Sequence, residues 1–180
     1  MNRAILLISL ALPLAACGSP AVDEKNASIE EVADKVRETS DEEGLLRPGK
    51  WSTTVSIEDM EIAGLGPEAA EHMKRMVVQT HTSESCLTPE EARQPKGKFF
   101  GGGENCRYEH FTMGGGKIDA EMRCEQGGMK QVMEMAGAYS PNSYQMRMKA
   151  TNEGGPGGQA MTMRMKVEAN RVGNCSGKES

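Results

Sequence analysis

Cysteines are the residues of this 180-residue chain with the most evident chemistry. Four of the five lie in the last hundred residues: Cys86, Cys106, Cys124 and Cys175. An even number of cysteines predicts disulfides in an exported chain, which the N-terminal segment described below indicates. No pair has the Cys-x-x-Cys spacing of a redox motif or a structural zinc site. Four cysteines allow three pairings. We favour Cys106–Cys124, because symmetry about Gly115 places them opposite each other, and this leaves Cys86–Cys175 as the second bridge.

The fifth cysteine, Cys17, lies in a segment that predicts covalent lipid attachment. A short positive start at residues 1–3 precedes an apolar run at 4–14, and Ala15 and Ala16 come directly before Cys17. This layout is typical of a secretory signal with a small-residue cleavage site, and the apolar run is too short to span a bilayer. A cysteine at the cleavage site is typical of bacterial lipoproteins, which are cut before the cysteine and acylated there with palmitate-like chains.

The expected location follows from that modification. Several acyl chains anchor a protein stably, whereas one chain does so only marginally. Gly18 favours the outer membrane, because bacterial lipoproteins retained at the inner membrane carry Asp at this position. We therefore expect a lipid-anchored protein of the cell envelope, held at the outer membrane and facing the periplasm, with the membrane as its partner through the N-terminal lipid.

Methionine is the other residue type with a telling spacing. It recurs at every second position in the predicted strands 130–139, 144–151 and 160–169, which puts it on one face of a sheet. Hairpin symmetry predicts Met135 opposite Met148, Gly137 opposite Met146, Met148 opposite Met163 and Met146 opposite Met165. The candidate apolar-ligand residues on this face are Met135, Met146, Met148, Met161, Met163 and Met165.

Three interpretations of the methionine face remain open. In the first, it is an ordinary core face packed under a predicted helix at 67–76. In the second, it is an adaptable groove or barrel interior that holds a lipid-like ligand. The third is Cu(I) binding, because thioethers are soft ligands; His72 and Met76, one helical turn apart, are the candidate metal ligands. Copper sites usually cluster methionine and histidine in short runs, whereas these methionines alternate along strands.

Composition and motifs argue against several other functions. Residues 46–180 hold equal numbers of acidic and basic side chains, so the basic excess of a nucleic-acid-binding protein is missing. None of the three histidines lies in a catalytic motif, and there is no Gly-x-Ser-x-Gly elbow. Gly64-x-Gly66-x-x-Ala69 lacks the βαβ setting of a dinucleotide site. We expect no cofactor and no enzymatic activity.

The elements that position these residues divide the chain into four parts. Residues 1–16 are the predicted signal peptide, and residues 17–45 are an acidic tether with a flexible start. Within the tether, the capping box Ser28-x-x-Glu31 predicts the start of a short, solvated helix. Residues 46–176 are the predicted disulfide-bonded domain, followed by a tail at 177–180. Alternating strands and glycine-rich turns predict a mainly β fold: an antiparallel curved sheet or open barrel of about seven strands with one or two short helices.

Short motifs along the chain indicate a family. They are Pro48-Gly49-Lys50-Trp51, Ser85-Cys86-Leu87-Thr88-Pro89, the spaced Cys106 and Cys124, and Arg171-Val172-Gly173-Asn174-Cys175. In this order they resemble the bacterial domain-of-unknown-function 3617 family over about residues 46–175. The resemblance implies an exported protein, often a lipoprotein, with disulfides, and it transfers no catalytic residue.

The resulting expectation is a non-enzymatic envelope lipoprotein that binds an apolar small molecule or another envelope protein. The alternative is a periplasmic protein that handles copper.

Overall fold

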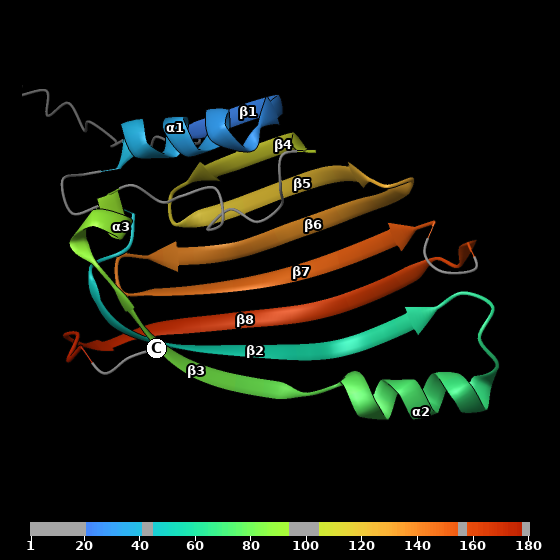
Figure 1. Cartoon of the computed structure of the whole chain (residues 1–180). Coiled ribbons are helices and arrows are strands. Elements are labelled where there is room, and N and C mark those ends of the chain that lie inside the picture. The colour runs from blue at the N-terminus through green and yellow to red at the C-terminus, as the bar shows by residue number, and fades with distance from the viewer. Residues whose placement is uncertain (1–20, 41–44, 94–104, 155–157, 178–180) are drawn as a thin grey trace, which may run out of the picture.

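One open antiparallel sheet organises the chain (Figure 1). The structure is a computed structural model and describes residues 21–40, 45–93, 105–154 and 158–177. The strands are β1 (Val22–Ser28), β2 (Gly49–Ile62), β3 (Thr80–Leu87), β4 (Cys106–Gly114), β5 (Lys117–Gln126), β6 (Met129–Ser140), β7 (Ser143–Glu153) and β8 (Met161–Gly173). The helices are α1 (Ile29–Thr39), α2 (Pro67–Val77) and α3 (Pro89–Arg93).

The strand order is β1-β4-β5-β6-β7-β8-β2-β3, and the sheet does not close into a barrel. The prediction of a mainly β, antiparallel open fold is confirmed, with eight strands instead of about seven and three short helices instead of one or two. β1 and β3 are the two edge strands. Hairpins join β4 through β8 in sequence, whereas β2 and β3 add to the far side of β8.

The segment predicted as a tether is corrected by the structure. β1 pairs with β4, and α1 follows it directly at the predicted capping box, where the Ser28 hydroxyl accepts a hydrogen bond from the Glu31 N–H at 3.2 Å. Val32 and Val36 of α1 are completely buried. The helix is not a solvated one, because its narrow apolar stripe finds a complementary apolar sheet face within the same chain.

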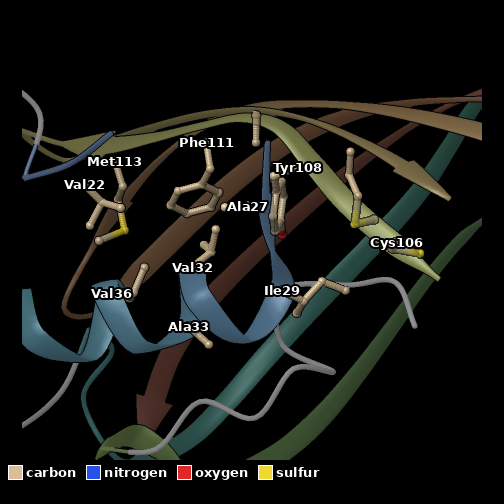
Figure 2. Packing of buried hydrophobic residues seen from close by; sticks show 12 residues of the cluster. Val22, Ala27, Ile29, Val32, Ala33, Val36, Cys106, Tyr108, Phe111 and Met113 are labelled. Carbon is tan, nitrogen blue, oxygen red and sulfur yellow. The ribbon is translucent and has the colours of Figure 1, made fainter. Parts of the chain in front are cut away.

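The main core lies between α1 and the strands β1, β4 and β5 (Figure 2). Tyr108, Phe111 and Met122 are its largest fully buried side chains. The rings of Tyr108 and Phe111 meet edge to face with centroids 5.2 Å apart, an arrangement that aromatic quadrupoles favour. A smaller cluster joins Leu46, Trp51 and Ala169.

Both predicted disulfides are present. Cys106 and Cys124 lie opposite each other in β4 and β5, with 4.0 Å between their Cα atoms. Cys86 at the end of β3 is joined to Cys175, beyond the end of β8, with a Cα–Cα distance of 5.5 Å.

Symmetry about Gly115 also predicts Tyr108 opposite Met122, His110 opposite Ala120 and Thr112 opposite Ile118. This β4–β5 register is confirmed beside the disulfide and wrong beyond it. Tyr108 lies opposite Met122 as expected, but a bulge between Tyr108 and His110 shifts the rest of β4. Phe111 therefore lies opposite Ala120, and Met113 opposite Ile118, where His110 and Thr112 were expected. The extra residue turns Phe111 and Met113 into the core, which alternation without a bulge would prevent.

Candidate apolar binding groove

The predicted methionine face exists and runs across β6, β7 and β8. Met135 lies opposite Met148, and Gly137 opposite Met146, as predicted. Met148 lies opposite Met165 and not Met163, so the predicted β7–β8 register is wrong by two residues. A two-residue shift keeps the same side chains on the same face, because the strand repeat is two, so the face survives an error in the turn.

An apolar groove of about 480 Å³ is hollowed into this face, beside the core under α1. We call it the methionine groove. It crosses β4 to β8, and Leu45 and Leu46, which follow α1 in the chain, line it together with the strands. The lining residues are Leu45, Leu46, Tyr108, Phe111, Ile118, Ala120, Met133, Met135, Tyr139, Tyr144, Met146, Met148 and Val167.

No lining residue carries a charge at neutral pH. The side-chain polar groups of the groove are three tyrosine hydroxyls, from Tyr108, Tyr139 and Tyr144. Burial raises the pKa of Tyr139 above its ordinary value, because the charged phenolate would lose its hydration, and it raises the pKa of Tyr108 as well. Such a groove can hold an uncharged apolar group, with tyrosine hydroxyls as the polar side-chain groups of its lining.

Gly137 lies opposite Met146, one of the residues that line the groove. A Cβ atom there would overlap the backbone oxygen of Gln145 and would lie 2.5 Å from Sδ of Met146. The thioether of Met146 thus occupies space that any other residue at 137 would need. The β6–β7 register shows no shift at this point, so this glycine marks a close approach of two strands rather than a bulge.

The other three predicted ligand residues lie on the same sheet face but outside the groove. Met161, Met163 and Met165 belong to β8, where they pair with Ile62, Met60 and Ile57 of β2, and all three are half-buried. Met135, Met146 and Met148 line the groove itself.

The wall formed by Leu45 and Leu46 is not predicted by the sequence pattern, because residue 45 falls in the predicted tether. The available signal is a pair of leucines placed between an acidic stretch and Pro48-Gly49-Lys50-Trp51. Phe111 was missed for a different reason, since an unrecognised bulge reverses its side chain.

Helix α2 does not cover the methionine face, which corrects the interpretation of that face as a core packed beneath residues 67–76. None of its residues is buried. Lys74 pairs instead with Asp59 at 2.7 Å, and Asp59 pairs with Arg164 at 2.8 Å, on the sheet face opposite the methionines. His72 and Met76 are both exposed, Met76 to 60%.

Among the described residues, His72 belongs to no cluster of the side chains that commonly bind metal ions. Within the described residues, no group of three or more His, Cys, Asp or Glu side chains is close enough to hold a metal ion.

The sheet face opposite the methionine groove has a shallower hollow of about 410 Å³, and charged residues such as Glu134, Lys149 and Arg164 line it. Lys149 and Glu134 form an ion pair at 2.8 Å there, so the two faces differ sharply in polarity.

The fold and the groove define a disulfide-bonded protein built on one open antiparallel sheet, with one half of a sheet face covered by a helix and the other half left as an apolar hollow. Residues 46–175 match the family described as "Protein of unknown function (DUF3617)", and the chain belongs to this family. Comparison with curated proteins found no match, and neither did comparison with solved structures. β1 and α1 lie upstream of the matched region.

Proposed function

We propose that this protein is an envelope lipoprotein that binds an apolar ligand in the methionine groove without catalysing a reaction. The groove supports the proposal most directly: about 480 Å³ is within the usual size of ligand pockets, and its lining is uncharged. Methionine side chains are unbranched and polarizable, so they adapt to a flexible chain such as an acyl group. Filling the groove would remove apolar surface from water on both partners, which drives such association.

The binding half of the proposal is tested with a fluorescent long-chain fatty acid and two variants of adjacent residues. Met148→Gln puts an amide into the groove, while Arg147→Gln makes the same new side chain on the opposite face of β7. Arg147 has no hydrogen-bond or ion-pair partner among the described residues, so its replacement breaks no contact there. We expect Met148→Gln to weaken binding by about tenfold, because a polar group must be desolvated, and Arg147→Gln to leave binding unchanged.

Native mass spectrometry of the protein purified from its own envelope provides the second test. A bound lipid-sized mass that is lost in Met148→Gln is expected. Bound copper without lipid would contradict the apolar-ligand proposal and favour the alternative, with His72 and Met76 as the first ligands to replace.

The location half of the proposal depends on Cys17, which lies outside the described residues. Mass spectrometry of the mature N-terminus should show acylated Cys17, and Cys17→Ser should release the protein from membranes. No helix in the described part of the chain is long and apolar enough to cross a membrane. Complete retention of the Cys17→Ser variant in the membrane fraction would show that another anchor or a tight membrane partner exists.

A further inference from the structure

The two edges of the sheet are built differently. β1 carries consecutive charged residues, Asp23, Glu24 and Lys25, and then Asn26 with a positive φ of 49° interrupts its pairing with β4. Charges and irregular backbone are the usual protections of an edge strand against pairing with another chain. Edge β1 is thus protected.

Edge β3 has almost none of these protections. Its sequence from Thr80 to Ser85 is short and polar, with no proline and no lysine, and these six residues are all exposed. Its register with β2 runs from Thr80 to Leu87 without a shift. The single acid, Glu84, is already paired with Lys50 at 2.7 Å. Among the described residues no strand pairs with its outer side.

The backbone groups that face outward can be identified. The N–H of Ile57 donates to the carbonyl of Gln79 at 2.9 Å, and hydrogen-bonded pairs alternate along an antiparallel ladder. The backbone groups of His81 and Ser83 therefore face β2. Those of Thr80, Thr82 and Glu84 point away from the sheet, as a row of donors and acceptors that no strand of the described residues pairs with.

Exposed apolar side chains precede this strand, and another lies two strands away from its other end. Of the four large hydrophobic residues that are exposed in the described part of the chain, Met76 and Val78 directly precede β3. Val172 is 53% exposed and lies in β8 next to Gly173. Gly173 pairs with Lys50 of β2, and Lys50 pairs in turn with Cys86 at the other end of β3.

We propose that β3 is a dimerisation edge, where a second copy of this chain pairs antiparallel with β3 about a two-fold axis at Thr82. In this register Thr82 lies opposite Thr82 of the partner subunit, and Thr80 opposite Glu84 of the partner subunit, so outward backbone groups meet outward backbone groups. The same register brings Val78 towards Cys86 of the partner subunit. An axis at Glu84 would instead oppose two carboxylates.

A second copy fits this edge better than an unrelated peptide because the edge is complementary to itself. Its hydroxyl side chains are small and uncharged, and Thr82 already bonds to the Thr54 hydroxyl at 2.9 Å on the sheet face opposite the groove. A two-fold dimer is also the commonest symmetric assembly of one chain. Pairing through β3 leaves the methionine groove free, so dimerisation and ligand binding are separable.

The test measures the dimer by native mass spectrometry and sedimentation of the intact protein released in mild detergent. Thr82→Glu would place two glutamates directly opposite each other across the axis, with their Cα atoms about 5.5 Å apart, and we expect the dimer Kd to rise by at least about tenfold. Thr54→Glu is the matched control: it removes the same hydroxyl bond and adds the same charge on the same face. Its two carboxylates would be three strand spacings apart, about 14 Å, beyond the Debye length of about 10 Å at 0.1 M salt.

Thr82→Val should keep the dimer, because the backbone carries the pairing. A second measurement needs no variant: amide exchange of Thr82 and Glu84 should slow as the concentration of wild-type protein rises. A wild-type protein that stays monomeric throughout the micromolar range would overturn the proposal. So would equal loss of the dimer in Thr54→Glu and Thr82→Glu, or an edge that binds another envelope protein and never its own copy.

Discussion

One face of the sheet has two halves that share the same alternation of apolar side chains. Helix α1 covers one half and leaves the other half uncovered. Over β4 and β5, helix α1 closes the face, and Tyr108 and Met122 are at most 1% exposed. Over β6 to β8 the same alternation places Met146 and Met148 inward, but they remain half-buried and line a groove. Figure 1 shows α1 over the β1–β4 end of the sheet only.

This difference teaches that alternation on a strand specifies which face is apolar, and not what lies on it. A methionine at position 122 becomes core because α1 packs on it, whereas a methionine at 148 meets no helix. The cover comes from a segment distant in sequence, upstream of the matched family region. Variants that treat the two halves alike therefore separate stability from binding.

The largest expected effect comes from the two disulfides, one in the covered half and one that joins edge strand β3 to the segment after β8. Replacing Cys86 and Cys175 together by Ser should lower the free energy of unfolding by about 4.5 kcal/mol, because the bridge closes a loop with a sequence separation of 89 residues. Replacing Cys106 and Cys124, separated by 18 residues, should cost about 3 kcal/mol. Urea unfolding of both variants measures the difference. A larger loss for the Cys106–Cys124 pair would mean that packing in the covered half outweighs loop entropy.

A matched methionine pair addresses the two halves directly. Met122→Ala should lower the free energy of unfolding by about 2–5 kcal/mol, because a fully buried side chain leaves a cavity under α1. Met148→Ala removes a half-buried side chain and should cost about 1 kcal/mol, while it weakens binding of the fatty-acid probe. Calorimetry gives the free energy of unfolding of each variant, and titration with the fatty-acid probe gives its binding affinity. If Met148→Ala destabilised the protein as much as Met122→Ala, the open half would be core after all.

Gly137 allows a test of the close approach of β6 and β7 beside the groove. Gly137→Ala should destabilise the protein by about 1–3 kcal/mol, because the new Cβ overlaps the Gln145 carbonyl and displaces the Met146 side chain. Ala138→Ser, one residue further on the exposed face, should stay within about 0.5 kcal/mol of wild type. Thermal unfolding measures both, and equal stability of the two variants would contradict the close approach of β6 and β7 in solution.

Much of the open half could be predicted from the sequence, and less of the covered half. The β6–β7 hairpin needs only alternation and a turn at Pro141-Asn142, both local signals, so its register was correct. The bulge in β4 and the packing of α1 have no local signal, because they depend on contacts between residues about 80 positions apart, such as Asn26 with Arg107. The groove is lined by residues from both halves, so predicting it requires the packing of α1 as well as the strand register. This explains why its wall at Leu45 and Leu46 could not be predicted.

The smallest expected effect concerns the start of the covering helix. Glu31 accepts a hydrogen bond from the Ser28 backbone N–H at 2.6 Å, and this bond lowers the pKa of Glu31 below its ordinary value. A carboxyl whose pKa is lower in the folded state stabilises the fold above its unfolded pKa, and this contribution is lost as the pH falls through the folded pKa. Acid should therefore loosen the capping box and, with it, the α1 cover.

Glu31→Gln separates the charge from the hydrogen bond. The amide oxygen of Gln still accepts the Ser28 N–H but does not titrate, so the variant should lose less thermal stability than wild type between about pH 7 and about pH 3. Glu30→Gln is the control, because Glu30 lies in the same turn, is exposed, and makes no hydrogen bond to the cap. The Tm of each protein across this range gives the comparison. If Glu30→Gln and Glu31→Gln reduced the acid dependence equally, general charge on α1 and not the capping box would set the acid response of the covered half.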